Sequence, residues 1–146
     1  MNRKDFEQYV DDFNHMRYDK VTGHFAPDIT VEYFDDAYSP YAPARILHGP
    51  KEFEANYRAL HAHTREIMEL QEFLARGDLM YVVLYTEFIT FKDAPAGGAR
   101  MRRKGDIVIM TNWVLYNMAS GDKFKRIRIA HFRNSDPETA RFKNMV

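Results

Sequence analysis

Apolar and polar side chains alternate at helical spacing near the N-terminus. A helix over residues 3–17 would carry Phe6 and Phe13 on one apolar stripe, so this segment is expected to be an amphipathic helix. A second short helix is expected over residues 18–25, because Gly23 near its end is a stop signal. The chain therefore begins with two helices.

The spacing changes to two directly afterwards. Apolar side chains alternate with more polar ones from Ile29 to Tyr33, which predicts a strand over about residues 28–36. The proline before this segment separates it from the helix, since proline biases its predecessor away from the helical region. Tyr33 becomes a phenol on a mostly apolar strand face, and Asp35 and Asp36 are expected in the following turn.

A loop and one long helix are expected next. Residues 37–50 are rich in proline and tyrosine, which indicates a loop, with a short extended piece at 45–48. A helix over residues 50–64 begins with proline and carries Phe53 and Tyr57 on its apolar stripe.

The second half of the chain reads as strands. The four strand-like runs cover residues 65–76, 78–92, 105–119 and 123–133. Gly77 and Gly121 lie in tight-turn signals, whereas residues 93–100 form a longer hairpin loop. A short terminal helix carrying Phe142 and Met145 is expected at the end.

This order of elements predicts an α+β fold in one domain over residues 1–146. Helices come first, and a long, mostly antiparallel meander follows. Such a sheet curls around the helices and leaves a cone whose wide mouth can hold a small molecule.

Composition narrows the possible functions. Lys plus Arg and Asp plus Glu number 21 each, so the formal net charge is zero and no excess of positive charge favours nucleic acid. The run from Arg100 to Lys104 is expected to be a solvated loop. The absence of cysteine excludes disulfides and thiolate sites. No membrane-spanning run or secretory leader is recognised, so a cytoplasmic protein that contacts no membrane is expected.

Two stretches resemble the nuclear transport factor 2-like superfamily. These are Phe25–Tyr33 after the second helix and Gly49–Phe53 at the start of the third, together with the Gly-Asp turn before the last strand. The resemblance covers about residues 3–133 and implies a cone-shaped sheet wrapped around the helices. The superfamily includes ketosteroid isomerase, scytalone dehydratase, limonene epoxide hydrolase and SnoaL-like polyketide cyclases, and also non-catalytic carriers. Fold alone therefore leaves the activity open.

Scytalone dehydratase gives the nearest comparison by residue. Tyr33 matches a tyrosine that helps to hold the catalytic water, and Asn112 resembles an asparagine of that enzyme. The main-helix histidine of that enzyme falls near His63 or Thr64. Its tyrosine and aspartate of the first helix fall at Phe13 and Asn14, and its second histidine falls near Ile89 or Thr90, so these positions depart from the pattern.

The register implied by the resemblance supplies the candidate catalytic residues. Glu87 would sit on an apolar face of the cone, where desolvation favours general acid–base work. His63 and His131 are alternative proton acceptors, and Tyr33 and Asn112 would donate hydrogen bonds to an oxygen that gains negative charge. The expected substrate-contacting residues are Phe13, Asn14, Phe53, Tyr57, His61, Tyr85, Met110, Tyr116 and Ile129.

These residues favour a cofactor-free enzyme without a metal. The expected reaction is isomerisation, cyclisation or dehydration of a hydrophobic polyketide- or terpenoid-like molecule by enolisation. The alternative is a non-catalytic carrier or a dimerising module of the same fold. Epoxide hydrolysis would need an Asp-Arg-Asp relay that the sequence does not place. A homodimer through the outer sheet face is expected, because Trp113 and Leu115 would be exposed there.

Overall fold

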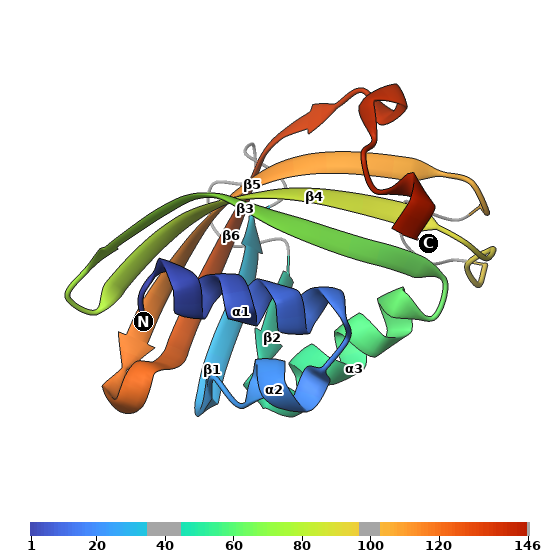
Figure 1. The fold of residues 1–146 in the computed structure, drawn as a ribbon. Coiled ribbons are helices and arrows are strands. Elements are labelled where there is room, and N and C mark those ends of the chain that lie inside the picture. The colour runs from blue at the N-terminus through green and yellow to red at the C-terminus, as the bar shows by residue number, and fades with distance from the viewer. Residues whose placement is uncertain (35–44, 97–102, 146) are drawn as a thin grey trace.

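The computed structural model describes residues 1–34, 45–96 and 103–145 (Figure 1). Asp35 and Asp36, most of the loop expected before residue 45, and Arg100 and Arg102 lie outside the described residues. The helices are α1 (Arg3–Asn14), α2 (Tyr18–Thr22) and α3 (Gly49–His61). The strands are β1 (Phe25–Phe34), β2 (Arg45–His48), β3 (Thr64–Arg76), β4 (Leu79–Thr90), β5 (Ile107–Ala119) and β6 (Lys123–Ser135).

The six strands form one mixed, curved sheet that does not close, in the order β2-β1-β6-β5-β4-β3. The β1–β6 pair is parallel, and the other neighbouring pairs are antiparallel. The three helices lie on the concave side of the sheet (Figure 1). This arrangement confirms the predicted α+β cone.

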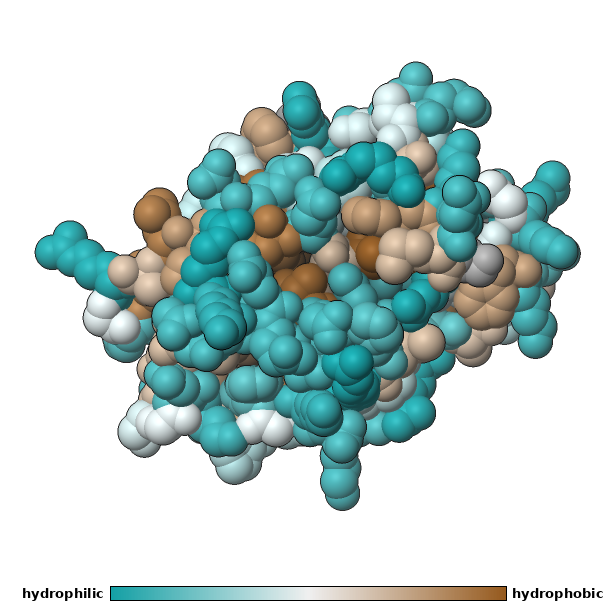
Figure 2. Space-filling model, in the orientation of Figure 1, coloured by the Kyte–Doolittle hydropathy of each residue, from teal (hydrophilic) through white to brown (hydrophobic). Residues whose placement is uncertain are grey.

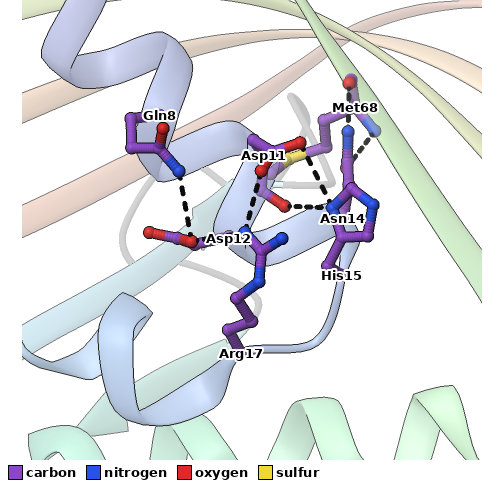
Figure 3. A network of polar contacts seen from close by, with 7 residues as sticks. All are labelled: Gln8, Asp11, Asp12, Asn14, His15, Arg17 and Met68. Atoms are coloured by element: carbon purple, nitrogen blue, oxygen red, sulfur yellow. Dashed lines mark hydrogen bonds and ion pairs between the residues drawn. The ribbon is translucent and has the colours of Figure 1, made fainter.

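Helix α1 is fixed at both ends by side chains. Asn2 and Asp5 form a capping box, in which each side chain accepts a backbone N–H of the other. At the other end, the Asn14 amide donates to the Met68 carbonyl and accepts the Met68 N–H, both at 2.8 Å (Figure 3). Since β3 is an edge strand, this pair of hydrogen bonds satisfies backbone groups of Met68 that would otherwise lack a protein partner. Helix α1 ends before the predicted residue 17, because Met16 adopts a left-handed φ of 55°.

Aromatic side chains form much of the hydrophobic core. Phe6 is fully buried and packs edge-on against Tyr116, and Tyr9 packs edge-on against Phe124. Phe25 contacts Phe53 of α3 in the same geometry, with ring centroids 4.7 Å apart.

The C-terminal segment differs from its prediction. In place of one helix, the structure has two 3-10 turns, η2 (Pro137–Thr139) and η3 (Lys143–Met145). The backbone N–H groups of Arg141 and Phe142 bind the Glu87 carboxylate, so these groups are not available for helical hydrogen bonds. The segment lies on the convex side of the sheet (Figure 1), away from the helices.

Candidate functional site

A large cavity opens between the helices and the concave face of the sheet. Its volume is about 1110 Å³, and its wall comes from α1, α3, all six strands and residues 92–96. Apolar residues gather in a hollow between β3 and the helices, framed by hydrophilic ones (Figure 2). Such a volume lies slightly above the usual range for small-molecule sites, which is about 300–1,000 Å³.

Many of the candidate residues lie on this wall. They are Phe13, Tyr33, Phe53, Tyr57, His63, Met110, Asn112, Tyr116, Ile129 and His131. The inner faces of β5 and β6 are those that the sequence predicted, because Asn112 and His131 are cross-strand neighbours and both line the cavity. Arg126 and Arg128, which alternate with the isoleucines of β6, lie on the other face.

Strand β4 has the opposite register to the predicted one. Thr86 and Phe88 line the cavity, whereas Tyr85 and Glu87 face the convex side. Both faces of this strand are covered, so its sequence is apolar on both faces and gives no alternation from which to read the register. The predicted placement of Glu87 and Tyr85 in the cone is therefore wrong.

Glu87 instead holds the C-terminal segment. Its side chain is 0% exposed, and its Oε1 accepts hydrogen bonds from the Tyr85 hydroxyl and the Arg141 N–H, both at 2.6 Å. Oε2 accepts the Phe142 N–H at 2.9 Å. The Arg141 guanidinium lies over the Tyr85 ring and forms two bonds with Glu69. Because its two oxygens already accept these hydrogen bonds, Glu87 ties the C-terminal segment to β4.

Asn14 and His61 also lie off the cavity wall, so their predicted contact with substrate is not where the structure places them. Asn14 is committed to the backbone of Met68. His61 is buried behind the wall at the end of α3, where it stacks on Tyr18. The shoulder position of His61 on its helix turns the ring toward α2 and β3 rather than toward the cavity.

Glu66 is a cavity residue that sequence reasoning missed. It is only 6% exposed and lines the cavity from β3, two residues into the strand. His61 Nε2 lies 3.2 Å from Glu66 Oε2, and Tyr18 Oη lies 2.6 Å from His61 Nδ1. When the imidazole is neutral, Nε2 carries its hydrogen toward the carboxylate and Nδ1 accepts from the phenol. The connection between α3 and β3 is short and brings Glu66 next to His61. In the sequence, a glutamate five residues after a histidine was the signal that could have pointed to this pair.

Two phenols form a second polar group in the cavity. The hydroxyls of Tyr33 and Tyr57 are 2.6 Å apart. Burial, followed by the proximity of Tyr33 and Glu66, raises the pKa of Tyr57 well above its usual value. Tyr57 therefore keeps its proton over the physiological range and can act only as a neutral hydroxyl. Glu66, Tyr33 and Tyr57 all line this cavity, so the carboxylate and the phenols share one space.

The remaining polar wall residues are nearer the mouth. His63 Nδ1 lies 2.7 Å from Thr64 Oγ1, and His131 Nε2 lies 2.8 Å from Asn134 Oδ1. Within the described residues, no three His, Asp or Glu side chains come together as a metal site would need. Nor is any described helix long and apolar enough to cross a membrane.

Comparison with known proteins gives similar structures at low sequence identity. No protein-family model and no curated protein matches the sequence. A nuclear transport factor 2-like protein of unknown function from Burkholderia pseudomallei is 16% identical, with a TM-score of 0.65 and 87% of each chain covered. The epoxide hydrolase/cyclase-like enzyme SalBIII, which has a role in pyran ring formation in salinomycin, is 14% identical, with a TM-score of 0.66 and 87% of each chain covered.

A third similar structure contains a ligand. It is a Mycobacterium tuberculosis protein in complex with estradiol-17beta-hemisuccinate, 12% identical, with a TM-score of 0.64 over 90% of this chain and 92% of that one. At such identities the likeness shows the fold and leaves the activity open. The chain has the nuclear transport factor 2-like fold.

Proposed function

We propose that this protein is a cofactor-free enzyme that moves protons on a hydrophobic small molecule held in the cavity. The observation that carries this proposal is the Glu66 carboxylate on the cavity wall, oriented from behind by the buried His61. Glu66 takes the role of general base for which the sequence suggested Glu87, His63 or His131. A carboxylate in a site largely shielded from water is well suited to accept a proton from carbon.

The proposed chemistry is enolisation. Glu66 removes a proton from the carbon next to a carbonyl group, and the electron pair of that C–H bond moves onto the carbonyl oxygen. The Tyr33 and Tyr57 hydroxyls are hydrogen-bonded to each other, and this pair donates a hydrogen bond to the oxygen as negative charge develops. Return of the proton from Glu66 to a different carbon gives isomerisation. Attack by the enolate carbon on a second carbonyl carbon of the same molecule, whose oxygen takes the proton from Glu66, gives cyclisation. Departure of a β-hydroxyl group as water, with the proton from Glu66, gives dehydration.

The wall favours a hydrophobic ring system as substrate. Phe13, Phe53 and Phe88 line the cavity together with aliphatic side chains of the sheet. The ring-forming SalBIII and the protein bound to an estradiol ester have the same fold, which supports a polyketide- or terpenoid-like substrate here.

Deuterium exchange tests the proposal without knowledge of the natural substrate. The protein is incubated in D2O with hydrophobic ketones such as β-tetralone, and loss of the α-proton signals is followed by NMR. We expect faster exchange than in buffer, and a rate reduced by roughly 10²–10⁴-fold in Glu66→Gln. Loss of exchange in His63→Ala or His131→Ala, with Glu66→Gln unchanged, would assign the base to a histidine instead.

A carrier is the second candidate function, favoured by the large cavity itself. Ketones would then bind with no exchange above the buffer rate, and Glu66→Gln would change only affinity. This result would exclude the enzyme.

We also propose a homodimer through the convex face. Trp113 is 42% exposed and stacks on Phe132, which is 51% exposed, with centroids 4.2 Å apart. Light scattering should give twice the chain mass at micromolar concentration, and Trp113→Lys should give the monomer mass. A monomeric wild-type protein would disprove this part of the proposal.

A further inference from the structure

One side of the cavity mouth carries polar side chains that the proposed chemistry does not use. Arg45 of β2, Asn112 of β5 and His131 of β6 all line the cavity. In the sheet, Tyr33 of β1 pairs with Arg45 on one side and with Ile129 of β6 on the other. Ile129 is two residues before His131, so Arg45 and His131 lie near the same level of the sheet. Glu66 is on β3, and Arg45 is on β2, at the opposite edge of the sheet.

The Arg45 guanidinium is held in place at the mouth. Its carbon lies 4.2 Å from the centroid of the Tyr33 ring, a cation–π contact. One terminal nitrogen donates to the Asn56 Oδ1 at 2.9 Å. A guanidinium has several further N–H donors in one plane, so this bond leaves donors on the group for a ligand. Two contacts fix the side chain before any ligand arrives, which lowers the entropic cost of using it.

Asn112 and His131 extend the same wall. In the described part of the chain, the Asn112 amide has no hydrogen-bond partner, although the residue is half-buried and lines the cavity. His131, directly opposite in the β5–β6 pair, is held by the Asn134 side chain. An amide with donors that face a cavity, next to an imidazole and on the same wall as a fixed guanidinium, is suited to oxygen-rich groups of a ligand.

We infer that the cavity takes substrates with a carboxylate, and that Arg45 binds this group at the mouth. This inference rests on the proposed function only in taking the cavity as the substrate site. A planar carboxylate matches the fork of the guanidinium, because two parallel N–H···O hydrogen bonds can form. With the carboxylate at Arg45, the hydrophobic body extends across the cavity and brings its far end toward Glu66. The substrate class is therefore a hydrophobic ring system with an acidic arm.

Matched fluorescent probes test this inference. Pyrenebutyrate and pyrenebutanol share one apolar body and differ in the acidic group, and their dissociation constants are measured at neutral pH by fluorescence titration. We expect the acid to bind about 10-fold to 100-fold more tightly than the alcohol, as for a hydrogen bond to a charged group. Arg45→Met should remove this preference and leave the affinity for the alcohol within about twofold, because the apolar wall is unchanged.

Arg58→Met is the control variant of equal charge. Arg58 is exposed on α3, lies over the Tyr18 ring and does not line the cavity. It should keep the full preference for the acid. Equal affinity for acid and alcohol in the wild-type protein, absence of binding by both probes, or a preference that survives in Arg45→Met would each overturn the inference. Because binding is measured without turnover, these outcomes are independent of whether deuterium exchange occurs.

Discussion

Glu66 on the concave face of the sheet and Glu87 on the convex face are both buried, and the two are held in different ways. Glu66 faces the cavity and has one described hydrogen-bond partner, the imidazole of His61. Glu87 lies on the convex face and accepts from a phenol and two backbone N–H groups. A carboxylate has about four lone-pair sites, so Glu66 keeps acceptor capacity toward the cavity while Glu87 has little left.

The two glutamates show that burial of a carboxylate and access of a substrate to it are separate properties. Both side chains are more than nine-tenths buried, and burial alone would nominate either one as a base. What distinguishes them is the space beside the carboxylate: an open cavity for Glu66 and the C-terminal segment for Glu87. A buried carboxylate is a candidate base only where a substrate can reach it.

Glu87→Gln is the sharpest test of the convex side. Glutamine keeps one acceptor oxygen and places an amide donor against the N–H groups of the tail, so a buried donor loses its partner. We expect the free energy of unfolding to fall by about 1–3 kcal/mol. Urea denaturation measures this change, and hydrogen exchange of residues 139–145 should become faster.

The same variant should keep its rate of deuterium exchange on β-tetralone within about twofold, because Glu87 does not touch the cavity. Glu69→Gln is the matched surface control, since Glu69 and Arg141 are both partly exposed, and should cost less than about 1 kcal/mol. A collapse of exchange in Glu87→Gln with unchanged stability would reverse the roles of the two glutamates.

His61→Met tests the support of Glu66 on the concave side. Removal of the imidazole donor leaves the carboxylate without its orienting partner, and we expect the rate of exchange on ketones to fall about tenfold. His61→Gln, whose amide can still donate to Glu66, should stay within about threefold of the wild-type rate. If both variants lost stability equally and kept the wild-type rate, His61 would be only a packing residue.

The sequence was informative where one sheet face is apolar and the other polar. On β6 the isoleucines alternate with arginines, and the predicted inward positions Ile127, Ile129 and His131 line the cavity. On β4 the sequence is apolar on both faces, because the core covers one and the C-terminal segment covers part of the other. A pattern of period two cannot set the register of a strand that is covered on both sides.

Glu66 could not be assigned for a related reason. Its strand has a mixed pattern, and its role depends on contacts with His61 and with the open cavity, which arise only when α3 and β3 fold back on each other. Sequence patterns of secondary structure report local spacing, whereas a base is defined by its neighbours in space.

A third glutamate, Glu32, is expected to contribute least to stability. It gives a reference value for a partly exposed ion pair on the convex face. Glu32 pairs with Arg126, whose side chain is 44% exposed, and the hydrogen bond from Arg126 holds the pKa of Glu32 below its usual value. The stabilisation is therefore present above the unfolded pKa and lost as pH falls through the folded one. Because solvent screens this pair, Glu32→Gln should cost less than about 1 kcal/mol at pH 7. Urea denaturation of both proteins from neutral to acidic pH should show the difference shrinking as Glu32 becomes protonated. If Glu32→Gln lowered the free energy of unfolding as much as Glu87→Gln, exposure of the partner would not determine how much a glutamate stabilises this face.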